Sequence, residues 1–293
     1  MTGDWIELTS DELSAAINPH GAELSSLMDA SGNELLTDAD PRWWTGRAPL
    51  LFPIVGRLAG DSYRLDDRRY HLPQHGFARR KRFALVEHRV DAVTLRLDAD
   101  NETRAFYPFD FQLEAAFRLR GARLEVAVTV ANLGERDMPF SFGFHPAFAR
   151  PLPFGAAAEQ HRILFDCPER AKVRRVAPDT GLIAAAAEPS PVIGRELVPD
   201  ATMFERDAII FDRLNSRGLL WGASGEPNLR IEFPDTPWLG VWQKPGARYL
   251  CIEPWAGMAD PVGFSGGIWD KPGMMRLAPG ERRVFRLAIE LTR

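Results

Sequence analysis

The stretch FDFQLEAAFRLRGARLEVAVTVANLG, residues 109–134, decides the fold class. Every second residue of its first half is apolar and most residues between are polar; the apolar ones are Phe109, Phe111, Leu113, Ala115, Phe117 and Leu119. A period of two is typical of a strand with one buried face. The alternation resumes after Gly121, with Leu124, Val126, Val128 and Val130. The stretch therefore predicts two antiparallel strands joined by a short turn.

The same alternation occurs at 93–97, 229–233 and 285–291, with turn signals between the segments. Helical signals are weak because 23 prolines and 24 glycines punctuate the chain, although one short helix is expected near residues 40–45. Residues 151–200 are rich in Ala and Pro and predict long excursions around a few strands rather than a linker. We therefore expect an all-β protein, with residues 1–293 forming one large antiparallel β-sandwich.

The chain has 293 residues, and 36 Lys and Arg against 40 Asp and Glu give a formal net charge of −4. No strong basic field exists to hold a nucleic acid, so we expect no such partner. The most apolar stretch, residues 48–55, is far shorter than the roughly 20 residues that cross a bilayer, and we expect no membrane span. Residues 1–20 lack the features of a secretory signal. With only Cys167 and Cys251, the chain favours a cytoplasmic location and no thiolate zinc site.

Two histidines stand in unusual surroundings. His75 lies in QHGFAR, residues 74–79, where the following glycine lets backbone approach a ligand; the structural alternative is a solvated turn. His145 lies in FGFHPAF, residues 142–148, among aromatics and before a proline that restricts its backbone. Its structural alternative is a core histidine bonded to a backbone carbonyl. Both are candidates for a binding or catalytic site.

Glu253 interrupts the apolar strand YLCIEPW, residues 249–255. A buried carboxylate must be paired, hydrogen-bonded or tuned toward a raised pKa for proton transfer, so Glu253 is either a structural ion pair or a catalytic group. Arg57 follows a proline-kinked apolar strand and either clamps hydroxyls or caps a sheet edge. Asp212, beside Arg213, is a further acceptor or a surface residue. Trp238, Trp242, Trp255 and Trp269 either stack on a sugar or fill the core.

These patches, in this order, resemble the aldose 1-epimerase (mutarotase) family of galactose mutarotase-like proteins, and in particular its bacterial LacX-like branch. The blocks are LFPIVGRL, LPQHGFAR, FGFHPAF, IFDRLNSRG, FPDTPWLGVWQKPGA and CIEPWAGMADP, and with the opening NPHGAELSSL they span nearly the whole chain. The resemblance implies a supersandwich of antiparallel strands that binds a sugar in an open groove on one sheet.

The resemblance also implies roles for matching residues. Glu253 is similar to the family's general base, which takes the proton from the anomeric hydroxyl, and His145 to the acid that protonates the ring oxygen. His75 and Arg57 match residues that hold the anomeric end, and Asp212 is the best match for the carboxylate that grips hydroxyls, with Asp207 nearby. The chain departs from the family at position 56, where many members have Asn before the arginine and this sequence has Gly.

The residue types agree with that chemistry. One base and one acid suffice to open a pyranose ring and close it on the other face, without a metal or an organic cofactor. We therefore expect an isomerase that interconverts the α and β anomers of a hexose, acting on a small-molecule sugar as a monomer or a homodimer. Free hexoses are expected to be better substrates than phosphorylated ones, because the only dense basic run near the patches is residues 79–82.

Three alternatives stay open. In the first, the same fold acts on a hexose 6-phosphate, and Arg79 or Arg80 reaches the phosphate. In the second, the protein binds carbohydrate without turnover, which the joint presence of His75, His145 and Glu253 disfavours. In the third, those three residues bind a metal in a cupin-like barrel, although the histidines lack the short spacing expected of such ligands.

Overall fold

The computed structural model describes residues 4–200 and 202–292, and strands dominate it. The pair predicted in residues 109–134 is present as β9 (Phe111–Arg120) and β10 (Arg123–Asn132), with Leu119 opposite Leu124 across an antiparallel register. Alternate residues of β9 are buried, as their period of two requires. The all-β, antiparallel architecture predicted from the sequence is confirmed.

A nine-stranded sheet contains this pair, in the order β16-β14-β18-β19-β23-β10-β9-β8-β7. Its other strands are β7 (Ala84–Arg89), β8 (Ala92–Asp98), β14 (Arg162–Phe165), β16 (Glu196–Leu197), β18 (Gly218–Gly222), β19 (Asn228–Glu232) and β23 (Arg282–Thr292). The central position belongs to β23, which pairs with β19 on one side and β10 on the other.

A second sheet runs in the order β15-β17-β20-β21-β12-β4, and β13 also pairs with β21. Its strands are β4 (Leu50–Leu51), β12 (Phe142–Phe144), β13 (Ala147–Ala149), β15 (Arg174–Arg175), β17 (Ile209–Phe211), β20 (Trp238–Trp242) and β21 (Tyr249–Ala256). Every residue of β21 is buried, because strands pair with it on both sides and the sheet packs on one of its faces.

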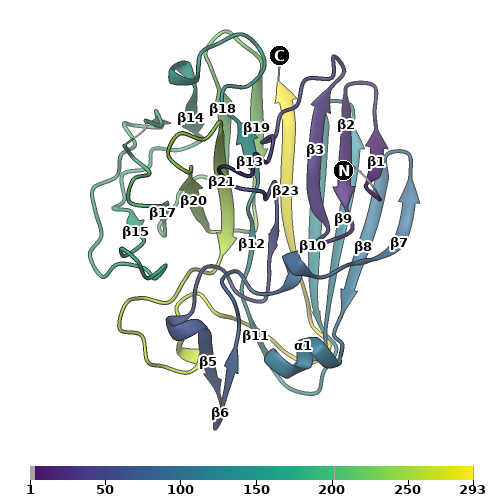
Figure 1. Cartoon of the computed structure of the whole chain (residues 1–293), viewed down its shortest axis with the longest axis vertical. Coiled ribbons are helices and arrows are strands. Elements are labelled where there is room, and N and C mark those ends of the chain that lie inside the picture. The colour runs from purple at the N-terminus through teal and green to yellow at the C-terminus, as the bar shows by residue number, and fades with distance from the viewer. Residues whose placement is uncertain (1–3, 201, 293) are drawn as a thin grey trace.

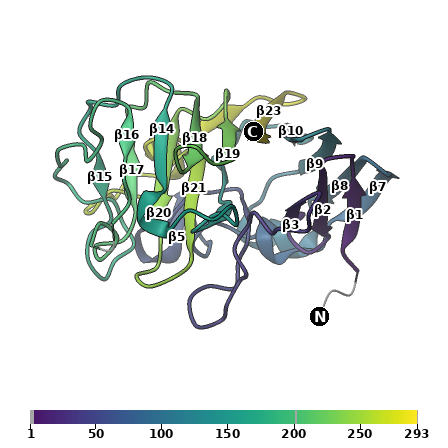
Figure 2. The same cartoon turned by 90° about the horizontal axis from the view of Figure 1, so that it is seen from above.

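A three-stranded sheet and two separate strand pairs complete the fold. The sheet holds β1 (Ile6–Thr9), β2 (Leu13–Asn18) and β3 (Glu23–Asp29); the pairs are β5 (Ser62–Leu65) with β6 (Arg68–His71) and β11 (Met138–Phe140) with β22 (Met275–Leu277). Figure 1 shows β1–β3 in front of β8 and β9, and β5–β6 projecting below the second sheet. Figure 2 shows the first sheet running along the molecule, with β7–β9 beside β1–β3 at one side, and β14 and β18 beside β20 and β21 of the second sheet at the other.

Helices are few, but the expected short helix at residues 40–45 is wrong. That segment is a single turn in which the Asp40 carbonyl accepts from the N–H groups of Trp43 and Trp44, and the turn does not continue into a helix. The α-helix of the described residues is α1 (Asn101–Phe106), which begins at a capping box formed by Asp100 and Thr103. Short 3₁₀ turns lie at Ala59–Asp61, Ala78–Arg80, Ala158–Gln160 and Ile268–Asp270.

One large hydrophobic cluster lies between the sheets. Phe142 of β12 stacks on Phe285 of β23 with ring centroids 4.7 Å apart, and Phe165 of β14 contacts Phe211 of β17. These aromatic contacts fix the second sheet on the first, so the opposite face of the second sheet is left to line a site. No helix in the described part of the chain is long and apolar enough to cross a membrane.

Candidate active site

A cavity of about 290 Å³ opens on the face of the second sheet that is turned away from the core. It is lined by Trp44, Gly56, Gln74, His75, Arg79, His145, Val176, Gly181, Ile183, Asp207, Ala208, Ile210, Trp242, Glu253, Trp255 and Ala259. Three of the five predicted site residues, His75, His145 and Glu253, therefore converge on one cavity although they are far apart in the sequence.

The central strand β21 positions Glu253. Along this strand Leu250 and Ile252 belong to the main core, so Glu253 and Trp255 point to the other face. The Trp255 ring occupies the space over two neighbouring glycines: a Cβ at Gly143 of β12 would lie 2.7 Å from it, and one at Gly240 of β20 would lie 2.6 Å from it. The glycines on both flanking strands thus make room for an indole at the floor of the cavity.

Glu253 is 1% exposed, and its surroundings disfavour its charge. Burial raises the pKa of this carboxyl well above its ordinary value, and the nearby Asp207 carboxylate raises it further. No hydrogen bond from the described residues reaches its Oε2 atom. A buried acid with unmet hydrogen-bonding capacity is suited to exchange a proton with a ligand.

His145 faces Glu253 directly, with Nε2 3.1 Å from Oε2. It follows β12 and precedes Pro146, whose carbonyl accepts from the Ile252 N–H and so ties the histidine loop to β21. Burial, assisted by the Arg79 charge, lowers the pKa of His145 to about 3. Its Nδ1 has no partner among the described residues. Burial thus favours the uncharged form of each member of the pair.

His75 is fixed by a reciprocal contact with Gly56. Its backbone N–H donates to the Gly56 carbonyl at 2.8 Å, and its ring Nδ1 accepts from the Gly56 N–H at 3.1 Å. The second bond leaves the ring proton of a neutral His75 on Nε2, which lies 3.3 Å from the side-chain amide nitrogen of Gln74, another lining residue. Burial lowers its pKa well below the ordinary value, with His145 and the arginines adding to the effect. The two histidine rings lie 5.6 Å apart, edge to face.

Glycine at position 56 has a structural reason. The residue has φ +73°, and an added Cβ would lie 2.6 Å from the Cβ of Ala259, which also lines the cavity. Glycine at position 56 therefore lets Ala259 pack directly on the backbone that anchors His75.

The structure does not bring Arg57 and Asp212 into the cavity lining. Arg57 forms a two-point ion pair with Asp61, at 2.8 Å for each contact. Its side chain packs against Gly181, where an added Cβ would lie 3.0 Å from the Arg57 Cδ. Asp212 follows β17 and pairs with Arg174 at 2.9 Å. Besides Glu253, the acidic residue on the lining is Asp207, which precedes β17.

Arg79 and Trp44 also line the cavity. The sequence did not predict them as contacts for the hydroxyls or the ring of a sugar. Arg79 is the member of the basic run 79–82 that lines the cavity. Arg80 turns to the Gly76 carbonyl, while Lys81 pairs with Glu102. Trp44 lies 4.8 Å from the His145 ring, and its signal was the Trp43–Trp44 doublet.

Within the described residues, ligand atoms of His145, Cys251 and Glu253 lie within 4.8 Å of one another. His75 does not belong to this group. The three-ligand set His75, His145 and Glu253 considered from the sequence is thus not assembled as such.

Comparisons with known proteins agree with this geometry. A family model described as "Aldose 1-epimerase" matches residues 4–187. The chromosomal protein LacX of Lactococcus lactis is 33% identical over 284 residues, covering 94% of this chain and 95% of its own. An Escherichia coli protein described as a candidate glucose-6-phosphate 1-epimerase is 30% identical, over 40% of each chain.

Solved structures are similar over almost the whole chain. A galactose mutarotase related enzyme from Lactobacillus acidophilus has a TM-score of 0.90 and 29% identity, covering 99% of this chain and 97% of its own. A galactose mutarotase-like protein from Lactobacillus casei has a TM-score of 0.90 and 27% identity, covering 98% and 100%. The supersandwich expected from the sequence is therefore the fold of this chain.

Proposed function

The chain belongs to the aldose 1-epimerase family of isomerases, and from this premise we propose that it interconverts the α and β anomers of a free hexose. The observation that carries the proposal is the Glu253–His145 pair, 3.1 Å apart at the floor of a cavity with aromatic walls. Ring opening requires a base that takes the proton from O1 and an acid that protonates O5, and both oxygens are bonded to C1. A protein that only binds sugar has no need of two buried, unsatisfied titratable groups.

The proposed cycle begins when the sugar's hydroxyls form hydrogen bonds with the pair and the proton of Glu253 moves to His145. The Glu253 carboxylate then takes the proton from O1, the imidazolium of His145 donates its proton to O5, and the C1–O5 bond breaks to give an open-chain aldehyde. Rotation about C1–C2 presents the other face of the carbonyl. O5 attacks this face as His145 takes its proton back and Glu253 returns its own to O1.

The resting state of the pair suits this cycle. An uncharged Glu253 and an uncharged His145 are the protonation states that coexist with the aldehyde, and they are also the states favoured by burial. The pair has the same net charge in its ionised and its neutral forms, so proton transfer never leaves an isolated charge in a buried site. Each group serves as acid in one direction and base in the other, and no metal or organic cofactor is needed.

The cavity's charge favours an unphosphorylated sugar. Arg79 is its single cationic lining residue, whereas Asp207 and Glu253 are acidic. His75, with its proton on Nε2, donates to a sugar oxygen, and Asp207 accepts from hydroxyls. Both described cysteines are free thiols, which supports a reducing, cytoplasmic location.

Saturation-exchange NMR of the anomeric protons tests the proposal, with glucose, galactose and their 6-phosphates as substrates. We expect exchange well above the spontaneous rate for a free hexose, with E253Q close to the spontaneous rate. Wild-type exchange in E253Q would overturn the mechanism. A clearly higher kcat/KM for a 6-phosphate would overturn the substrate class.

A further inference from the structure

A buried ion pair lies beside one wall of the cavity. Lys271 Nζ lies 2.8 Å from Oδ1 of Asp260, and the two side chains are 1% and 3% exposed. The ammonium also donates to the Met258 carbonyl at 2.6 Å. Neither charged residue lines the cavity. Apolar residues of similar size often replace a buried ion pair without loss of stability, so stability alone is a weak reason for charges at this place.

Asp260 connects three segments that reach the cavity. Its backbone N–H donates to the Arg57 carbonyl, and its carbonyl accepts from the Ile183 N–H, both at 2.9 Å. Its Oδ2 accepts from the Ala59 N–H at 2.8 Å. Ile183 lines the cavity, and so does Ala259, the residue before Asp260. One aspartate therefore joins the segments near residues 57, 183 and 259, which are far apart in the sequence.

The contact continues through Gly56 to His75. A Cβ added at Gly56 would lie 2.6 Å from the backbone nitrogen and the Cβ of Ala259, so these two segments are closely packed. The Gly56 N–H donates to Nδ1 of His75, and the Gly56 carbonyl accepts from the His75 N–H. A donor at Nδ1 keeps the proton of the neutral ring on Nε2. The position of Gly56 therefore decides the tautomer of His75.

We propose that Asp260 is a positioning residue of the sugar site. Its carboxylate holds the Ala59 N–H, fixes residues 56–59 against residues 259–260, and so keeps the His75 proton on Nε2. Lys271 orients that carboxylate, since the ammonium takes Oδ1 and leaves Oδ2 for Ala59. The inference rests on the proposed function, in which Nε2 of His75 donates to a sugar oxygen.

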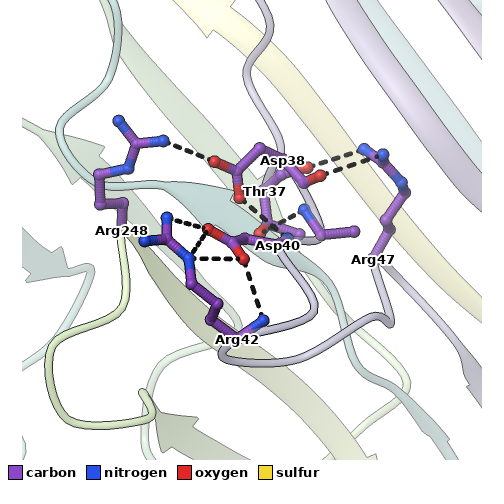
Figure 3. A network of polar contacts seen from close by, with 7 residues as sticks. Thr37, Asp38, Asp40, Arg42, Arg47 and Arg248 are labelled. Atoms are coloured by element: carbon purple, nitrogen blue, oxygen red, sulfur yellow. Dashed lines mark hydrogen bonds and ion pairs between the residues drawn. The ribbon is translucent and has the colours of Figure 1, made fainter.

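The loop that carries Trp44, another lining residue, offers a matched control because its ion pairs lie at the surface (Figure 3). Asp38 pairs with Arg248 at 2.7 Å, and the two side chains are 49% and 72% exposed. Exposed ion pairs contribute little to the structure that they join. D38N should therefore leave both His75 and the kinetics unchanged.

Three variants isolate the hydrogen bond between Asp260 and Ala59. K271M/D260N and K271M/D260L remove both charges, so neither leaves a buried charge unpaired. D260N keeps an oxygen that accepts from Ala59, whereas D260L removes it. A59P removes the donor instead. Ala59 begins a 3₁₀ turn and follows Leu58 at φ −89°, ψ 151°, and both conditions suit a proline.

Nitrogen-15 NMR of the His75 ring, assigned by the signals that H75N lacks, and the kinetics of anomer exchange are the readouts. The wild type should show the tautomer protonated on Nε2, and K271M/D260L and A59P should show both tautomers. These two variants should raise KM for the best free hexose about three- to tenfold, the range for one lost uncharged hydrogen bond. Their kcat should stay within about twofold, because that bond acts alike on ground and transition states. K271M/D260N should keep the wild-type tautomer and a KM within about twofold.

A wild-type tautomer in K271M/D260L and A59P would overturn the positioning role, and A59P alone decides if K271M/D260L does not fold. Equal KM losses in K271M/D260N and K271M/D260L would also overturn it, because charge or packing rather than the acceptor would be responsible. The ring signals are recorded without sugar, which separates these outcomes from a failure of the proposed function. Mixed tautomers in K271M/D260L, without turnover of any sugar by the wild type, would retain the positioning of His75 and reject the epimerase activity.

Discussion

Two glutamates of this protein are equally buried and differ in every other respect. Glu169 and Glu253 are each 1% exposed. Glu169 accepts from the backbone N–H and the hydroxyl of Ser216, both at 2.7 Å, and from the N–H of Asn215 at 3.0 Å. Glu253 faces the imidazole of His145, and its Oε2 receives no hydrogen bond from the described residues.

The difference shows what separates a structural carboxylate from a chemical one. Glu169 closes the loop after β17, and its hydrogen bonds replace the water that burial removes. Glu253 lacks that replacement and keeps a raised pKa. Burial is common to both, so unmet hydrogen-bonding capacity, rather than burial, marks the candidate site.

The largest expected effect is on catalysis. E253Q and H145N should each lower kcat for mutarotation by about 10²–10⁴-fold, because each removes one proton transfer from the transition state. KM should change far less, since the amide groups preserve much of the hydrogen bonding to the bound sugar. The double variant should be little worse than either single variant, because the two groups act as a unit. Polarimetry above the spontaneous background measures all three.

The matched change at the other glutamate should act on stability instead. E169Q replaces a carboxylate acceptor by an amide whose NH₂ group faces the donors of Asn215 and Ser216. We expect unfolding to become about 1–3 kcal/mol easier, with kcat per folded molecule unchanged. Thermal and urea denaturation measure the first quantity. A loss of turnover in fully folded E169Q would remove the distinction between the two glutamates.

The pH dependence of stability should single out Glu253. Its folded pKa is raised above the ordinary value of 4.5, so above pH 4.5 the unfolded chain releases a proton that the folded chain keeps. Stability is then lost as pH rises. E253Q should therefore be more stable than the wild type by about 0.5–2 kcal/mol at pH 7, and the gain should vanish below pH 4.5. A gain that is independent of pH would point to packing rather than charge.

His145 should show the opposite sign. In the folded protein the pKa of His145 is lowered from 6.5 to about 3. Between these pH values the imidazole therefore binds a proton in the unfolded chain but not in the folded chain. Stability is lost as pH falls from 6.5 toward 3, at no more than about 1.4 kcal/mol per pH unit. H145N should flatten this acid limb relative to the wild type in urea titrations. An unchanged acid limb would mean that His145 is protonated in the folded protein.

The smallest effect should separate two aspartates of the same region. Asp207 lines the cavity and Asp212 pairs with Arg174 outside the lining. D207N should raise KM about threefold, because the Asp207 carboxylate accepts from sugar hydroxyls in ground and transition states alike, and kcat should change far less than in E253Q, because Asp207 acts on catalysis only through the pKa of Glu253. D212N should leave KM within about twofold. A larger KM effect for D212N than for D207N would restore the assignment made from sequence resemblance.

Sequence patterns were sufficient for the strands and for the pair of groups at the centre. Alternation with a period of two places side chains on faces without knowledge of partners, so the buried positions of β9 and β10 could be predicted, although β9 begins at Phe111 rather than Phe109. Glu253 could be recognised because a carboxylate within an apolar strand is costly wherever it lies. His145 was detectable because aromatics and a proline surround it.

Loop residues could not be placed in the same way. Asp207 lies in a loop with φ +64°, and Arg57 is drawn to Asp61, which has φ +49°. These left-handed residues turn the chain in directions that no local pattern encodes, because tertiary contacts maintain them. The turn at Trp43–Trp44 was overestimated as a helix for the same reason: it ends after one turn, where both side chains pack on the second sheet.

The order of the strands has a consequence for synthesis of the chain. The strand at the centre of each large sheet comes late in the sequence: β21 starts at residue 249 and β23 at residue 282. Before they emerge from the ribosome, β10 and β19 have no partner between them, and β12 and β20 are separated by an empty slot. Both sheets therefore stay incomplete until β21 and β23 have been synthesised and inserted between their neighbours. Incomplete sheets of this kind expose apolar edges to aggregation, and activity is not expected before β23 has been inserted.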